Sequence, residues 1–111
     1  MKTRGKYILK GKATIEETDL LKWAKWMETA NRIVRQTRII KGLKLGKKAL
    51  GIPVMVSTVF LGLDHSFGFG KPLLFETMIF EGKHSGYQER YTTWEEAERG
   101  HKRALKLVHE K

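Results

Sequence analysis

The chain has 111 residues, of which 41% are hydrophobic and 10% aromatic, and it contains no cysteine. This composition supports one hydrophobic core and excludes a disordered chain, a disulfide-stapled mini-protein and any site built on a thiolate. Lys and Arg total 22 against 12 Asp and Glu, which gives a formal charge of +10. Neither a membrane span nor a signal peptide is recognisable, so we expect a single cytosolic domain over residues 1–111.

The first third of the chain predicts an arm, a helix and a strand. Residues 1–15 are expected to form an N-terminal arm or small hairpin, because short β-prone segments flank Lys10-Gly11-Lys12. Over residues 16–31 the apolar residues recur at steps of three and four, which predicts an amphipathic helix whose start Thr14 with Glu17, or Thr18 alone, can cap. β-branched residues then predict a strand over residues 32–40.

Residues 41–52 hold three glycines and four lysines and are expected to be a flexible, basic connection that ends at Pro53. They belong to a stretch, from Thr29 to Leu63, that contains no acidic residue. The first 50 residues hold 14 basic and 4 acidic residues, so they carry the entire charge excess. The cations of this stretch are candidate anion-binding residues: Arg32, Arg35, Arg38, Lys41, Lys44, Lys47 and Lys48.

Two interpretations of these cations stay open. In the first they form a solvated surface that keeps the protein soluble. In the second the fold gathers them into one patch that binds a polyanion or a phosphorylated ligand. On a strand, alternation would place Arg32 and Arg38 on one face and Arg35 and Lys41 on the other, so the total charge carries more weight than the spacing.

The strongest strand signal covers residues 54–63, and a second strand is predicted over residues 73–80 after a loop. The two segments together predict a hairpin with long arms. A strand over residues 87–92 and a helix that begins at Thr93, with Glu96 completing a capping box, follow. Gly100 inside that helix costs about 1 kcal/mol relative to alanine, which suggests the close approach of another backbone.

These elements predict an α+β fold, with an antiparallel sheet of about four strands and two helices packed on one face. Both faces of the long hairpin are mostly apolar, whereas two helices in a chain of this size can cover only one face. Self-association through the other face, and hence a homo-oligomer, is therefore expected.

The loop of the long hairpin displays Phe67, Phe69 and Lys71 among glycines. Aromatic planes beside a cation can stack on bases, so these three residues join the candidate binding set. The favoured alternative is a loop whose phenylalanines pack onto the sheet. The segment Gly68-Phe69-Gly70-Lys71 lacks the spacing and the following Ser or Thr of a phosphate loop.

Four ionisable residues occupy otherwise apolar settings: Asp64, His65, Glu76 and His101. A structural network among them is the favoured interpretation. The alternative is a divalent-metal or acid–base centre, for which Asp64, His65 and His101 are weak candidates. No nucleophile turn supports a Ser-His-Asp arrangement, so neither a catalytic residue nor a cofactor is expected.

Three segments carry a resemblance: STVFLGLDH at residues 57–65 with Phe67-Gly68, LFETM at 74–78, and RYTTWEEA at 90–97 with Gly100-His101. Together they resemble a group of small uncharacterised proteins of tailed bacteriophages and prophages, over residue 56 to about residue 105. The resemblance implies a viral setting, with the host cytoplasm as location, and no established activity. Segment 41–52 is longer and more basic than the usual pattern of that group.

Three functional hypotheses follow. The first is a small, non-enzymatic phage accessory protein that binds nucleic acid or a phosphorylated nucleotide through its basic surface. The second is an effector that docks on an acidic surface of a host protein and inhibits or redirects it. The third is a metal-dependent hydrolase around Asp64, His65 and His101.

Overall fold

A computed structural model describes residues 5–110 of the chain, except for the side chains of residues 43–45 and 49. The described part forms β1 (Tyr7–Lys10), β2 (Ala13–Glu16), α1 (Leu20–Thr29), β3 (Ile33–Leu45), β4 (Lys48–Phe60), β5 (Phe75–Phe80), β6 (Gln88–Tyr91) and α2 (Trp94–His109). Strands β3 to β6 make an antiparallel sheet in the order β3-β4-β5-β6, and β1 pairs with β2 in a separate hairpin. The expected α+β class with a four-stranded antiparallel sheet is confirmed.

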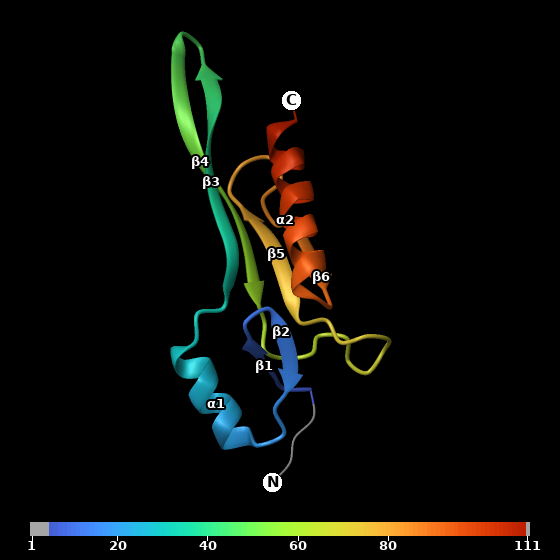
Figure 1. The fold of residues 1–111 in the computed structure, drawn as a ribbon. Helices are drawn as coiled ribbons and strands as arrows, with labels where there is room; N and C mark the ends of the chain where they lie inside the picture. The colour runs from blue at the N-terminus through green and yellow to red at the C-terminus, as the bar shows by residue number, and fades with distance from the viewer. Residues whose placement is uncertain (1–4, 111) are drawn as a thin grey trace.

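Helix α2 lies along one face of the sheet (Figure 1). The predicted capping box fixes its start, because the Glu96 N–H donates to Thr93 Oγ1 at 3.1 Å and the Thr93 N–H donates to Glu96 Oε1 at 3.0 Å. Neither helix of the described residues is both long and apolar enough to cross a lipid bilayer.

Helix α1 is placed differently from the expectation of two helices on one face. It lies beyond the end of the sheet and contacts β1 (Figure 1). Trp26 connects it to the core, since its ring meets that of Phe60 edge-on at 5.8 Å. Asp19, rather than Thr14 or Thr18, caps its start by accepting the N–H groups of Leu21 and Lys22, because β2 keeps the chain extended as far as Glu16.

The core lies between α2 and the sheet. Inward-facing residues alternate along β4, where Val54, Val56, Thr58 and Phe60 are all buried. One buried cluster comprises Val54, Val56, Ile79, Ala104 and Val108, and a second comprises Phe60, Leu74, Phe75, Tyr91 and Ala97. The sheet and α2 therefore form one continuous scaffold.

Residues 41–52, expected to be a flexible connection, form a β-hairpin instead. β3 and β4 remain paired as far as Leu45 and Lys48, which leaves the two-residue turn Gly46-Lys47. Gly46 has a φ of +63°, as the first central residue of a type II′ turn requires. We call residues 41–52 the β arm.

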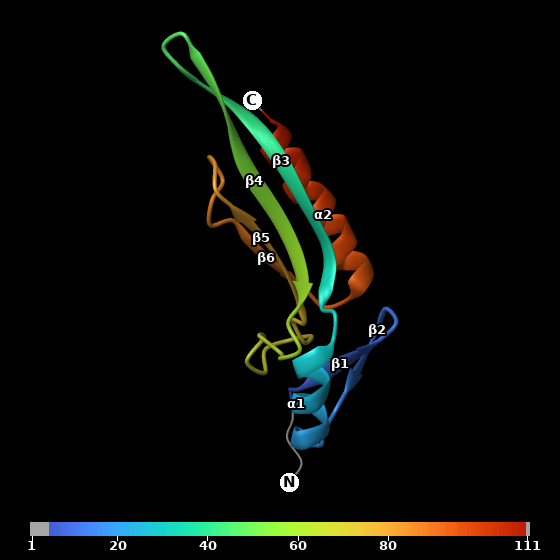
Figure 2. The same ribbon diagram turned by 90° about the vertical axis from the view of Figure 1, so that its left-hand side faces the viewer.

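The β arm extends past the C-terminal end of α2 and elongates the molecule (Figure 2). The principal dimensions are 62 × 28 × 22 Å. The radius of gyration is 16.9 Å, compared with about 13 Å for a compact domain of this length. The arm is therefore supported by its own strand pairing and turn over much of its length.

In the described part of the chain, no helix covers the sheet face opposite α2. Ile40 and Phe80 on this open face are 64% and 45% exposed. Its polar corner is Glu76, whose Oε2 accepts from Arg90 Nε at 2.9 Å and from Gln88 Nε2 at 2.6 Å. Self-association through this face stays a prediction.

Candidate anion-binding surface

The candidate cations follow the edge strand β3 and the tip of the β arm. Pairing of Arg35 with Thr58 and of Lys41 with Ile52 places both residues on the face of α2, whereas Arg38, opposite Met55, lies on the open face. Lys47 and Lys48 are exposed at the tip, and the Lys44 side chain lies outside the described residues. The cations thus line a ribbon on both of its faces instead of forming one patch.

Within the described part of the chain, no carboxylate forms an ion pair with a cation of this ribbon. The ion pairs among the described residues are Arg90–Glu76 and Arg103–Glu89, and none of the candidate cations takes part in them. Arg32 differs from the others because it is half-buried and its Nη1 donates to the Phe60 carbonyl at 3.5 Å. Charge therefore remains available for a ligand along β3 and at the tip of the arm.

Arg35 interacts electrostatically with a carboxylate on α2, that of Glu98. A hydrogen bond from Trp94 Nε1 holds the pKa of Glu98 below its ordinary value, and the charges of Lys12, Arg35 and Lys102 act in the same direction. Arg35 thus lies in the field of a carboxylate on the neighbouring helix. The cations that best fit an external anion are Arg38, Lys41, Lys47 and Lys48.

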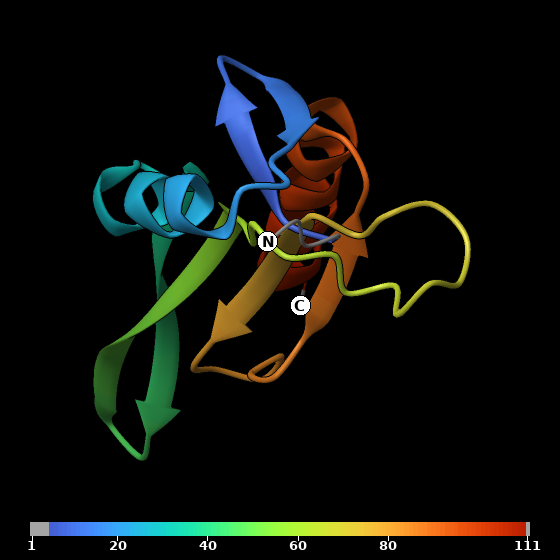
Figure 3. The same cartoon turned by 90° about the horizontal axis from the view of Figure 1, so that it is seen from below.

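We call residues 64–73 the aromatic loop, which projects from the body between β4 and β5 (Figure 3). Phe67 and Phe69 are 81% and 85% exposed, so the favoured expectation that they pack onto the sheet is wrong. Phe67 adopts a φ of +54°, a left-handed conformation that costs a non-glycine residue about 1–2 kcal/mol. The loop therefore displays its aromatic side chains at a conformational cost.

Hydrogen bonds to one carboxylate close the base of the aromatic loop. Asp64 Oδ1 accepts from the N–H groups of Ser66 at 2.8 Å and Leu73 at 3.0 Å, and the His65 N–H donates to the Leu73 carbonyl at 3.0 Å. Desolvation acts to raise the pKa of Asp64, but hydrogen bonds, led by the one from the Ser66 N–H, and the charge of His65 together outweigh it, so the pKa is lowered. A charged Asp64 thus holds the two ends of the loop together.

The change Asp64→Ala is expected to lower the free energy of unfolding by about 1–2 kcal/mol, because two part-buried N–H groups lose their acceptor. Urea unfolding followed by circular dichroism measures the loss. Asp64→Asn is the matched control, since its amide oxygen keeps an acceptor in place, and it should lose clearly less. Equal losses in the two variants would contradict this role for Asp64.

The aromatic loop and the β arm lie at opposite ends of β5. The loop directly precedes the start of this strand, whereas its last residue, Phe80, pairs with Met55 beside the base of the arm. Figure 1 shows the same separation. The structure therefore does not bring Phe67, Phe69 and Lys71 together with the lysines of the arm.

The expected network of Asp64, His65, Glu76 and His101 is not formed. Asp64 and His65 lie at the base of the aromatic loop, Glu76 lies on the open face, and His101 lies in the core beneath α2. These places are separated because the sheet lies between Glu76 and His101. Among the described residues, no group of three His, Asp or Glu side chains is arranged to hold a metal ion.

His101 instead joins a hydroxyl network that the sequence did not indicate. Its Nε2 lies 2.9 Å from Thr37 Oγ1 and its Nδ1 lies 2.7 Å from Thr58 Oγ1, which in turn lies 2.5 Å from Thr77 Oγ1. Burial, aided by the charge of Arg35, lowers the pKa of His101 and favours the neutral ring. Because both nitrogens have partners and the residue is 0% exposed, this network ties α2 to the sheet.

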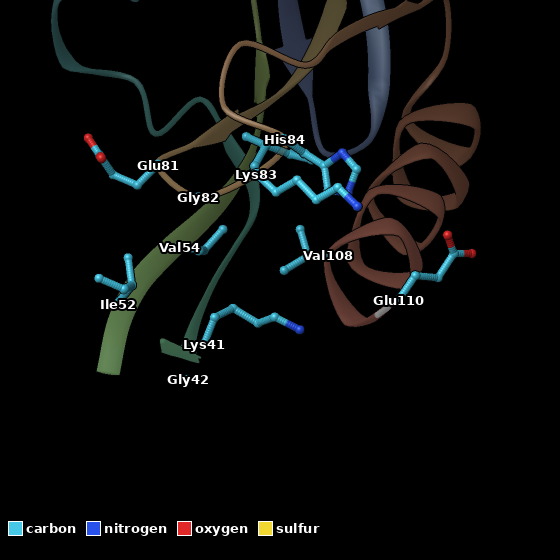
Figure 4. Close-up of a pocket in the computed structure, with 11 residues that line it drawn as sticks. Lys41, Gly42, Ile52, Val54, Glu81, Gly82, Lys83, His84, Val108 and Glu110 are labelled. Atoms are coloured by element: carbon cyan, nitrogen blue, oxygen red, sulfur yellow. The ribbon is translucent and has the colours of Figure 1, made fainter. Parts of the chain in front are cut away.

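A pocket of about 420 Å³ lies at the base of the β arm, between the arm, the turn after β5 and the C-terminal end of α2 (Figure 4). Its apolar lining comes from Ile52, Val54, Ile79 and Val108. Charged or titratable side chains also line it: Lys41, Glu81, Lys83, His84 and Glu110. We call it the arm-base pocket; of the candidate residues from the sequence it includes Lys41.

Comparison of the chain with protein-family models, with curated proteins and with solved structures gives no match.

Proposed function

We propose that this chain is a non-enzymatic nucleic-acid-binding protein whose β arm contacts the phosphate backbone of a duplex. The observation that carries the proposal is a projecting two-stranded ribbon on which Arg38, Lys41, Lys47 and Lys48 form no ion pair with a carboxylate of the described residues. The major groove of B-DNA, about 12 Å wide, admits a ribbon of this kind. Each cation that meets a phosphate releases a condensed counterion, which favours binding.

The spread of the cations favours a polymer over a single nucleotide. A mononucleotide needs several cations that converge on one phosphate group, whereas these cations lie on both faces and at the tip of a ribbon. At about 3.3 Å per residue, the strand from Arg38 to the turn at Lys47 spans about 30 Å. A duplex presents phosphates along about nine base pairs over that length.

The composition of the arm favours binding without sequence preference. Residues 41–52 contain no Asn, Gln or Arg, which are the side chains that most often read base edges. Contacts between lysines and phosphates position the protein without reading sequence. Duplexes of equal length and unrelated sequence are therefore expected to bind equally well.

We place this activity in an accessory protein of a tailed bacteriophage, acting on nucleic acid in the host cytoplasm. The resemblance of residues 56 to about 105 supports that setting. The net charge of +10 supports association with a polyanion.

The double change Lys47→Gln/Lys48→Gln tests the role of the arm. Fluorescence anisotropy with a labelled 20-base-pair duplex, repeated at several NaCl concentrations, gives the slope of log K against log salt. We expect that slope to become smaller by about 2, because two phosphate contacts are lost. Lys22→Gln/Lys25→Gln in α1 removes the same charge from exposed positions at the other end of the molecule, and should change the slope much less.

Three results would contradict the proposal. Equal slopes in the two double variants would show that only the total charge matters. Binding that does not weaken with salt would rule out counterion release. Displacement of the duplex by an equimolar amount of ATP would favour a single-phosphate site instead.

A further inference from the structure

Two features of the molecule are complementary in chemistry and lie at opposite ends of β5. The aromatic loop presents two exposed phenylalanines at one end, and the arm-base pocket presents an apolar hollow at the other. We propose that the aromatic loop of one molecule inserts Phe67 and Phe69 into the arm-base pocket of a second copy, so that copies join head to tail.

The loop is built to present its phenylalanines. Asp64 closes its base through two backbone hydrogen bonds, and Phe67, which is 81% exposed, holds a left-handed conformation at a cost. Full burial of one such side chain contributes about 1.5–3 kcal/mol, so two exposed rings are a substantial unsatisfied hydrophobic surface. Contact with an apolar partner would recover that energy.

The arm-base pocket is large enough for both rings. A cavity of about 150 Å³ holds one benzene molecule, so two phenyl rings need about 300 Å³. The pocket offers about 420 Å³. Its apolar wall comes from Ile52 and Val54 on β4 and Val108 on α2, which lie around the hollow in Figure 4.

The charges at the contact also match in part. Lys71 follows the phenylalanines on the aromatic loop and is exposed. Glu81 and Glu110 belong to the pocket lining, and Glu81 points away from the hollow, where an incoming lysine can reach it (Figure 4). Lys41 and Lys83 line the pocket as well and would repel Lys71. Lys71 therefore has to approach on the side of Glu81 or Glu110.

The topology makes this contact one between molecules. Strand β5 separates the loop from the pocket by about 17 Å, so the loop cannot fill the pocket of its own chain. The contact joins two different surfaces, the aromatic loop of one molecule and the arm-base pocket of the next. Such a contact can repeat from molecule to molecule and form an open chain or a closed ring. The two rings bury about 300–500 Å², well below a standard interface, so assembly should depend strongly on concentration.

Complementation between two variants tests the proposal. Phe67→Ser/Phe69→Ser removes the rings at exposed positions, and Ile52→Trp fills the pocket. Light scattering from about 10 μM to 1 mM should show a mass that rises with concentration for the wild type and stays at 12.8 kDa for each variant alone. An equimolar mixture of the variants should reach twice that mass and no more. The only contact left is between the aromatic loop of Ile52→Trp and the open pocket of the phenylalanine variant.

Controls separate this contact from the other candidates. Phe80→Ser alters the open face and should leave assembly unchanged. Lys47→Gln/Lys48→Gln should also assemble normally in nuclease-treated protein, so failure of nucleic-acid binding and failure of assembly are distinguishable.

Several outcomes would overturn the inference: a monomeric wild type at 1 mM, assembly that survives loss of both phenylalanines, or a mixture that stays monomeric. If Ile52→Trp does not fold, dilution of ¹⁵N-labelled wild type remains decisive. The amide signals of Gly42, Gly82 and Glu110 should shift on dilution, and should be independent of concentration in the phenylalanine variant. Shifts at the open face instead would identify a different interface.

Discussion

The change Gly100→Ala is expected to lower the free energy of unfolding by about 3 kcal/mol. Alanine normally stabilises a helix interior by about 1 kcal/mol relative to glycine. Here, however, a Cβ atom would overlap the hydroxyl and ring of Tyr91, which is only 5% exposed between the sheet and α2. Equilibrium urea unfolding at pH 7 measures the difference.

A double-mutant cycle isolates the overlap at Gly100. In a Tyr91→Ala background the added methyl group has space, so Gly100→Ala should be neutral or stabilising there. Destabilisation by a similar amount in both backgrounds would mean that something other than the Tyr91 ring requires glycine. The sequence suggested a close backbone at Gly100, and the structure shows a side chain in that place.

Stability is expected to fall as the pH decreases below about 6.5, by up to about 1.4 kcal/mol per pH unit. Burial, with a smaller contribution from Arg35, lowers the pKa of His101 in the folded protein, while the unfolded chain keeps the ordinary value of 6.5. Below pH 6.5 the unfolded state therefore binds a proton that the folded state does not. The stability is fully present above pH 6.5 and is lost as the pH falls towards the lowered pKa.

Urea unfolding between pH 8 and pH 5 measures this dependence. Because His101→Gln cannot titrate, its free energy of unfolding should change much less with pH than that of the wild type. The variant should also be less stable at pH 8, because the contacts of His101 to Thr37 and Thr58 are broken. The window lies above the ordinary pKa values of Asp and Glu, about 3.9 and 4.3, so carboxylates contribute little to the slope. An unchanged slope in His101→Gln would assign the proton to another group.

Local sequence signals predicted the elements near the C-terminus well. The helix after Thr93 was found because its capping box and its apolar spacing both lie within a few residues. Strands β5 and β6 followed from β-prone segments bounded by turns. These signals also sufficed for the α+β class.

The β arm escaped prediction because its stability comes from pairing between segments, which local propensity does not show. Glycine and lysine are depleted in strands, so residues 41–52 resembled a connection. Pairing nevertheless extends to the turn, and Gly51 allows the close approach of Ile40. The one usable signal was Leu45-Gly46-Lys47-Lys48, a two-residue turn with glycine in first place.

The candidate site was predictable in residue type and not in arrangement. Alternation correctly placed Arg35 and Arg38 on opposite faces of a strand. No sequence pattern shows whether loop phenylalanines are buried, and Phe67 and Phe69 proved exposed. The hydroxyl network around His101 joins Thr37, Thr58 and Thr77 from three different strands, so it depends on the register of the sheet.

The position of β3 has a consequence for handling the protein. This 13-residue strand is an edge of the sheet, and among residues 5–110 no strand pairs with the other side of its backbone. Such an edge can recruit a strand from another molecule and begin aggregation, and positive side chains like Arg35, Arg38 and Lys41 oppose that by mutual repulsion. Concentrated salt weakens this repulsion. Concentrated salt during purification is therefore expected to lower the solubility of the protein.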